Sequence, residues 1–174
     1  FNGATFTMSG GSINNNSAHT KGGGVFVRWD NNSGNENYFI MTGGVISGNT
    51  AAKGSGVAND YSFTIGGSAV IAADNNVYLD KLNSSSYVPC VTVADGYSVP
   101  SGYSYGAVIT WYYGNSILDT KVLVAESGTL SYAQCNMFAL TPVTGETGST
   151  STLYCIAPNG VIAKAGAGVT TSYD

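Results

Sequence analysis

The stretch Phe39-Ile-Met-Thr-Gly-Gly-Val-Ile-Ser-Gly-Asn-Thr-Ala51 occurs twice in this chain. Its other copy is Phe6-Thr-Met-Ser-Gly-Gly-Ser-Ile-Asn-Asn-Asn-Ser-Ala18, at an offset of 33 residues, and Phe, Met, Gly-Gly, Ile, Asn and Ala recur in register. A weaker third copy, Phe63-Thr-Ile-Gly-Gly-Ser-Ala-Val-Ile71, follows 24 residues after the second. Self-similarity at this period is typical of a solenoid, in which each unit buries its apolar face against its neighbours.

Each copy reads as short strands joined by tight bends. Apolar and polar residues alternate over short runs, while Gly-Gly and Asn at the bends supply positive φ. Hairpin signals are missing within a copy, whereas equivalent strands recur between copies. We therefore expect parallel pairing between copies, coiled into a right-handed parallel β-helix of the all-β class.

This arrangement predicts columns of like side chains. The expected columns are Phe6, Phe39 and Phe63; Met8, Met41 and Ile65; Ile13, Ile46 and Val70; and an amide ladder of Asn16 above Asn49.

The chain is expected to form one structural unit with two parts. Parallel rungs are predicted over residues 1–125, with clear repeats at 5–79 and degenerate ones at 80–125. A C-terminal antiparallel β cap is predicted over 126–174, with hairpins built from 134–140, 153–156 and 161–164. The Asn159-Gly160 step favours a tight hairpin turn, and a cap keeps the last sheet edges from aggregating.

An inserted loop explains why one repeat spacing is longer than the other. Eleven residues, 28–38, connect the first rung to the second, whereas only 60–62 cross the same gap in the next rung. Because loops on a rigid scaffold often carry binding residues, this loop is a candidate contact site. The alternative is a solvent-exposed loop without a binding role, in which the Trp side chain folds over the side of the solenoid. The candidate contact residues are Arg28, Trp29, Asp30, Glu36 and Tyr38.

The first rung has no cap before it. A bare parallel edge recruits further strand, so we expect either a longer solenoid before Phe1 or another subunit docked there. The candidate assembly edge comprises Phe1, Thr5, Phe6 and Met8.

Composition excludes several classes of function. Charged residues make up only 9 % of the chain, with a net charge of −4 and a single arginine, so a nucleic-acid partner is not expected. No segment approaches the ~18 apolar residues of a membrane span. The cysteines Cys90, Cys135 and Cys155 fit no zinc motif. Two alternatives remain open for these residues. All three are buried thiols, or one disulfide forms, for which Cys135 and Cys155 are the preferred pair.

The sequence of the repeats resembles that of a known family. The run Phe-Thr-Met-Ser-Gly-Gly-Ser-Ile from Phe6, with Asn-Ser-Ala and Gly-Gly-Gly-Val-Phe-Val after it, is similar to repeats of right-handed parallel β-helix, pectin-lyase-like proteins of bacterial surfaces. Autotransporter passengers and polymorphic outer-membrane proteins carry such repeats. The resemblance implies an extracellular, cell-surface scaffold used for adhesion or as a filament building block, or, in some relatives, a polysaccharide-cleaving enzyme.

The residues favour a non-enzymatic role. A calcium-dependent lyase needs converging carboxylates and a base, and a hydrolase needs paired carboxylates. Here the acids are isolated in sequence, although Asp30 and Asp60 are expected to meet near Arg28 on adjacent rungs, and His19 has no sequence partner. We therefore expect no catalytic residue, no cofactor and no metal.

Two further hypotheses concern partners. Aromatic rings stack on sugars and dominate interfaces, so a host or polysaccharide ligand could bind an aromatic surface. The alternative is assembly with other copies, head to tail, through the open edge. The candidate aromatic surface comprises Tyr103, Tyr105, Trp111, Tyr112 and Tyr113.

Overall fold

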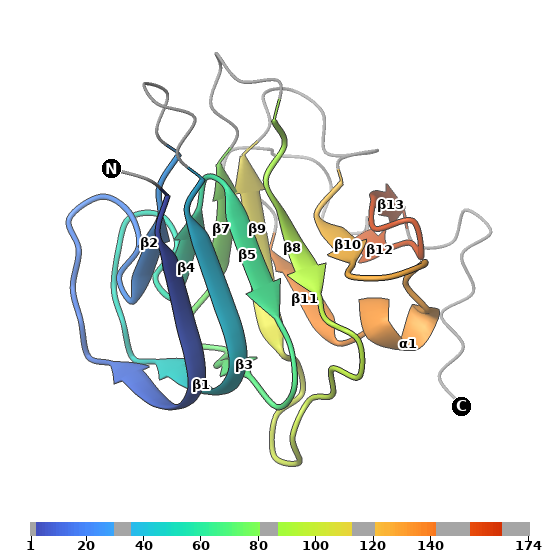
Figure 1. Cartoon of the computed structure of the whole chain (residues 1–174), viewed down its shortest axis with the longest axis horizontal. Coiled ribbons are helices and arrows are strands. Elements are labelled where there is room, and N and C mark those ends of the chain that lie inside the picture. Colours follow the sequence, from blue (N-terminus) through green and yellow to red (C-terminus); the bar gives the residue numbers. More distant parts are fainter. Residues whose placement is uncertain (1–2, 30–35, 81–86, 113–120, 142–153, 165–174) are drawn as a thin grey trace.

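The computed structural model describes residues 3–29, 36–80, 87–112, 121–141 and 154–164. Within these ranges the protein is a parallel β-solenoid that runs along its long axis, with strand β1 at one end and a small C-terminal hairpin at the other (Figure 1). The predicted all-β solenoid with an antiparallel C-terminal element is confirmed.

Two long sheets form the walls of the solenoid. The first has the order β1-β3-β5-β8-β10, with β6 also paired to β3, and the second has the order β11-β9-β7-β4-β2. The strands of the first sheet are β1 (Thr5–Asn14), β3 (Tyr38–Ser47), β5 (Ser62–Ile65), β6 (Val70–Ile71), β8 (Cys90–Val93) and β10 (Leu123–Ala125). Those of the second are β2 (Val25–Val27), β4 (Val57–Asn59), β7 (Val77–Asp80), β9 (Ala107–Tyr112) and β11 (Phe138–Thr141).

All pairing in these two sheets is parallel, and it follows the sequence repeats. Phe6 lies beside Phe39, and Phe39 beside Phe63, while Met41 joins Met8 to Ile65. The three Phe rings stack at centroid distances of 5.3 and 5.1 Å with interplanar angles of 10°. The predicted Phe and Met columns are confirmed.

One predicted column is out of register by one residue. Ile46 lies beside Ile13 as expected, but its partner in the next rung is Ile71, and Val70 lies beside Val45. The third rung breaks its strand between β5 and β6 with a turn at Gly67, whose φ is +55°. The extra residue in that turn moves the pairing forward by one position.

The C-terminal part also differs in part from the expectation. β12 (Tyr154–Ile156) and β13 (Ile162–Lys164) form the predicted antiparallel hairpin, and Gly160 has a φ of +79° in its turn. Residues 134–140 do not form a hairpin. They include the end of α1 (Tyr132–Cys135), which begins with a capping box between Ser131 and Gln134, and most of β11, which pairs in parallel with β9.

The hairpin covers the last rung. The N–H groups of Val122 and Leu123 both donate to the carbonyl oxygen of Gly160, over 2.9 and 3.2 Å. Leu123 and Ile162 are fully buried beneath this contact. Since a sheet edge with free backbone groups recruits other strands, the hairpin closes this end of the solenoid at the start of β10, while β11 pairs only with β9 among the described strands.

Candidate functional site

The N-terminal end of the solenoid is open. Among the described strands, β1 pairs only with β3 and β2 only with β4, so one edge of each sheet has no neighbour. Two aromatic side chains are exposed there, Phe6 by 49 % and Phe26 by 42 %. Large apolar side chains on a strand edge mark a surface that buries area when another strand docks.

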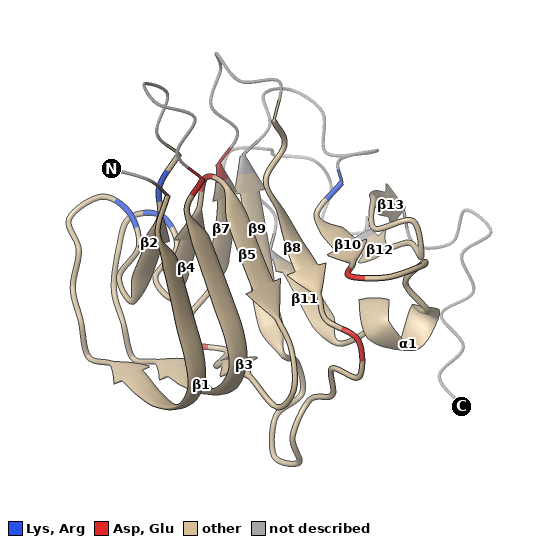
Figure 2. Cartoon of the chain, viewed as in Figure 1, with Lys and Arg blue, Asp and Glu red and all other residues tan. Residues whose placement is uncertain are grey.

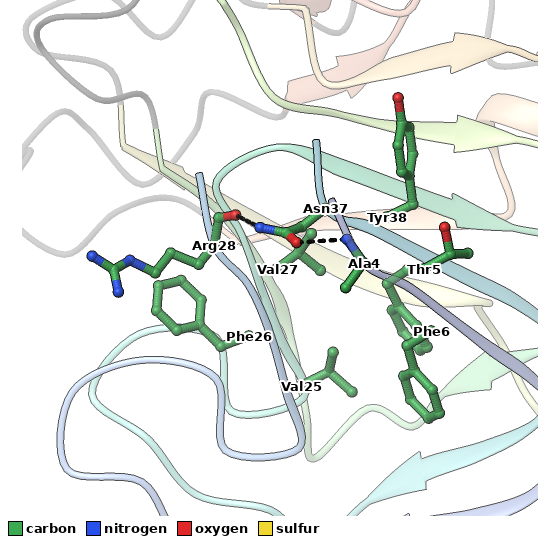
Figure 3. Close-up of a pocket in the computed structure, with 10 residues that line it drawn as sticks. Ala4, Thr5, Phe6, Val25, Phe26, Val27, Arg28, Asn37 and Tyr38 are labelled. Carbon is green, nitrogen blue, oxygen red and sulfur yellow. Dashed lines mark hydrogen bonds between the residues drawn. The ribbon is translucent and has the colours of Figure 1, made fainter. Parts of the chain in front are cut away.

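A cavity of about 290 Å³ opens between the two edge strands (Figure 3). Its lining combines two sets of residues that the sequence analysis treated as separate sites, the assembly edge and the contact loop. Its main lining residues are Thr5, Phe6, Phe26, Arg28, Asn37 and Tyr38. The structure therefore brings two members of each set together at one end of the solenoid, Thr5 and Phe6 with Arg28 and Tyr38.

Asn37 holds the two edges in place at the rim of this cavity. Its Oδ1 accepts a hydrogen bond from the N–H of Ala4 over 3.1 Å, and its Nδ2 donates to the carbonyl oxygen of Arg28 over 2.8 Å (Figure 3). The sequence analysis missed Asn37. Nothing in the polar run Asn35-Glu36-Asn37 distinguishes this amide from its neighbours, since its role depends on two distant backbone groups.

The loop aromatics stack beside the open end. Trp29 lies 4.9 Å from Tyr61 and 5.8 Å from Tyr87 between ring centroids, as in the alternative in which Trp29 folds over the solenoid side. Tyr38 donates a hydrogen bond to Glu36, which lowers the pKa of this exposed carboxyl and raises the pKa of the Tyr38 phenol.

An ion cluster links Lys21 of the first rung to Asp60, just after β4, and to Asp80, at the end of β7. The Lys21 Nζ lies 3.0 Å from an oxygen of Asp60 and 2.6 Å from an oxygen of Asp80. Burial alone would lower the pKa of Lys21, but the two carboxylates outweigh it and the pKa is raised. Burial raises the pKa of Asp60, and Lys21 offsets only part of this effect. Both carboxylates are buried and form ion pairs with Lys21, an arrangement that fits a structural role.

Of the remaining residues predicted at the assembly edge and in the contact loop, one is buried and two lie outside the described residues. Met8 is buried, so its side chain belongs to the core rather than to the exposed edge. Phe1 and Asp30 lie outside the described residues, so the expected meeting of Asp30 with Asp60 is not described, and Asp60 binds Lys21 instead.

Of the expected aromatic surface, the described part of the chain shows two exposed rings and one buried ring. Tyr103 and Tyr105 are exposed by 40 % and 44 %, on the connection between β8 and β9. Trp111 differs from the expectation because it is only 2 % exposed and lies in the core, at the position of β9 that pairs with Leu79. The Tyr112 side chain and the whole of Tyr113 lie outside the described part.

The three cysteines are free thiols in this structure. Burial raises the pKa of Cys90 and of Cys135 to about 11, and it also raises the pKa of Cys155. Thiols with raised pKa values are poor nucleophiles near neutral pH.

Charged side chains are sparse over both sheets (Figure 2). In the described ranges, no group of three or more His, Cys, Asp or Glu side chains is placed to hold a metal ion. None of the helices described there has the length and apolar character needed to cross a membrane. Compared with known protein families, curated proteins and solved structures, the chain matches none.

Proposed function

We propose that this chain is a non-enzymatic structural or adhesive module of a cell surface, and that it forms the capped terminal section of a longer β-solenoid. The observation that carries the proposal is the contrast between its ends. Among the described strands, β1 and β2 have no neighbour at one end, where Phe6 and Phe26 are about half exposed, whereas the β12–β13 hairpin bonds to the start of β10 at the other. One end is built to join further β-structure and the other to stop it.

The non-enzymatic part of the proposal is supported by the state of the two carboxylates that meet at Lys21. A carboxylate that acts as an acid or base must reach the substrate. Asp60 and Asp80 are buried and share Lys21 as their partner. The extracellular location is part of the same proposal, and it is supported by the resemblance of the repeats to those of bacterial surface solenoids.

Head-to-tail filaments of this chain alone are disfavoured by the same contrast. Such a filament requires the last rung to pair with the first rung of another copy, but the hairpin already occupies the backbone of Val122 and Leu123. Isolated chains are left with open-to-open contact, which gives pairs.

Sedimentation velocity over a concentration series tests the proposal. The unmodified chain is expected to form pairs as its concentration rises, and the double variant Phe6→Lys, Phe26→Lys is expected to stay monomeric. A matched control, Tyr105→Lys, changes a ring that is exposed by 44 % but lies away from the open end, and should pair as the unmodified chain does. A chain that is monomeric throughout, or a control that abolishes pairing equally, would contradict the proposal.

Carbohydrate binding is a second candidate function, favoured by the exposed rings of Tyr103 and Tyr105 on one connection. Rings that stack on sugars need a free face. Glycan-array binding that is lost in the double variant Tyr103→Ala, Tyr105→Ala would support this function, and a chain that binds no glycan would exclude it.

A further inference from the structure

Three asparagines at one corner of the solenoid form a ladder of hydrogen bonds that runs in one direction. The Nδ2 of Asn16 donates to the Oδ1 of Asn49 over 3.0 Å, and the Nδ2 of Asn49 donates to the Oδ1 of Asn75 over 2.9 Å. The backbone N–H groups of Asn16 and Asn49 donate to the same two oxygens, over 3.0 and 3.2 Å. Each rung therefore gives two hydrogen bonds to the amide oxygen of the following rung.

The ladder lacks a donor at the open end. Asn49 and Asn75 are both 2 % exposed, and each amide oxygen accepts two hydrogen bonds from the preceding rung. Asn16 is exposed, and within the described ranges its Nδ2 donates to Asn49 and to the Asn14 carbonyl while its Oδ1 accepts nothing. The next donor pair would have to come from outside these ranges.

The ring column is unfinished at the same end. Phe39 is covered on both sides, by Phe6 and by Phe63, and is 1 % exposed. Phe6 is covered on one side only and is 49 % exposed. Phe6 lies near the start of β1 and Asn16 lies just beyond its end. A partner that extends both columns must therefore align with β1 along its whole length.

We propose that the open end takes a parallel β-solenoid rung from a further polypeptide segment, with an aromatic ring above Phe6 and an asparagine above Asn16. This inference rests on the proposed function and specifies its partner. The partner's asparagine donates its side-chain amide and its backbone N–H to the Oδ1 of Asn16, as Asn16 does to Asn49.

A second copy of this chain does not fit that description. In its last rung the β12–β13 hairpin already bonds to the backbone of Val122 and Leu123, which obstructs stacking of this rung on β1. In an open-to-open pair both copies present the acceptor end of the ladder, so neither supplies the missing donors. Such a pair is held only by rings and edge backbone, and is weaker than stacking of a parallel rung.

An added rung tests the inference in the full chain. A duplicate of residues 5–37 placed directly before Thr5, in place of residues 1–4, continues the 33-residue repeat in register. Backbone amide exchange of β1 in the native state is then compared with and without the duplicate. We expect the duplicate to slow this exchange roughly tenfold or more, because β1 changes from an edge strand to a central strand.

Two variants of the duplicate isolate the asparagine. Replacing its copy of Asn16 with Ala should make β1 exchange roughly fivefold faster than with the unaltered duplicate, because one side-chain hydrogen bond is lost. Replacing its copy of Asn14, whose side chain in the native rung is exposed and bonded only locally, should leave exchange within about twofold. The unfolding transition of the native rungs reports whether each variant remains folded.

The outcomes separate this inference from the proposed function. A duplicate that leaves β1 exchange unchanged would overturn both, because the edge would not accept a rung. Equal slowing with and without the added asparagine would overturn only the inference. Slowing of β1 exchange in the unmodified chain at high concentration, to the level given by the duplicate, would show a second copy as the partner and would also overturn the inference.

Discussion

The two ends of this solenoid finish the same pair of sheets in opposite ways. At the open end, Phe6 is 49 % exposed, and β3 is the single neighbour of β1 among the described strands. At the closed end, Phe138 in the last strand of the second sheet is 5 % exposed, and the hairpin bonds to the backbone of Val122 and Leu123 at the start of β10. The repeated columns build the body of the solenoid, but only the hairpin, which is no part of the repeat, stops it.

The largest expected effect comes from removing one ring at each end. Phe138→Ala should lower the free energy of unfolding by about 4 kcal/mol, because it leaves a cavity in a buried site beside Tyr97. Phe6→Ala should cost about 1 kcal/mol, since half of that ring is already in water. Denaturant titration of both variants measures the difference. Equal losses would mean that the two ends do not differ in burial.

The docking of the hairpin depends on one glycine. Gly160 has a φ of +79°, and a Cβ there would overlap the carbonyl oxygen of Leu123. Gly160→Ala should therefore cost about 3 kcal/mol, through backbone strain together with loss of the close approach. Gly128 has a φ of +66° with open space around it, so Gly128→Ala should cost only about 1 kcal/mol.

Unfolding free energies of both glycine variants test this account of the cap. The Gly160→Ala variant should also show new concentration-dependent association through the uncovered end, which sedimentation detects. A Gly160→Ala variant as stable as Gly128→Ala would show that the hairpin does not close the solenoid.

The amide ladder should weaken toward the open end. Asn49→Ala is expected to cost about 2 kcal/mol, because it removes a buried amide that bonds to the rungs on both sides. Asn16→Ala should cost about 1 kcal/mol or less, because Asn16 is exposed and bonds to one rung. Thermal or denaturant unfolding distinguishes the two, and a larger loss at Asn16 would contradict the order of burial.

The smallest effect is a pH dependence at the closed end. Burial raises the pKa of Cys135 to about 11, whereas an unfolded chain releases this proton near the ordinary thiol value of 9.0. The folded state keeps the proton longer, so stability falls as pH rises through this range, by about 1 kcal/mol at pH 10 for this thiol. Cys135→Ala should flatten the pH profile by that amount, and an unchanged slope would contradict the assignment.

The repeat predicted most of the body of the fold. Phe, Met and Asn recur at fixed offsets, and stacking of identical side chains is the simplest way for short strands to bury them, so the columns at Phe39 and Met41 and the link from Asn16 to Asn49 were predictable. The third member of the ladder, Asn75, was not, because the turn at Gly67 shifts the register after the third Phe.

The ends of the molecule were harder to predict than its middle. The bare edge at Phe6 followed from the position of the first repeat, but the joining of that edge to Arg28 and Tyr38 in one cavity depends on Asn37, whose partners are backbone groups. At the other end β11 has no repeat signature and joins the second sheet only through tertiary pairing with β9. Local sequence does not distinguish such a strand from a hairpin arm.

Negative-stain electron microscopy of the isolated chain tests most directly whether one end is open and the other closed. The account predicts single particles and pairs joined at the β1–β2 end, with no longer species at any concentration. Fibres, or pairs joined through the β12–β13 hairpin, would contradict it.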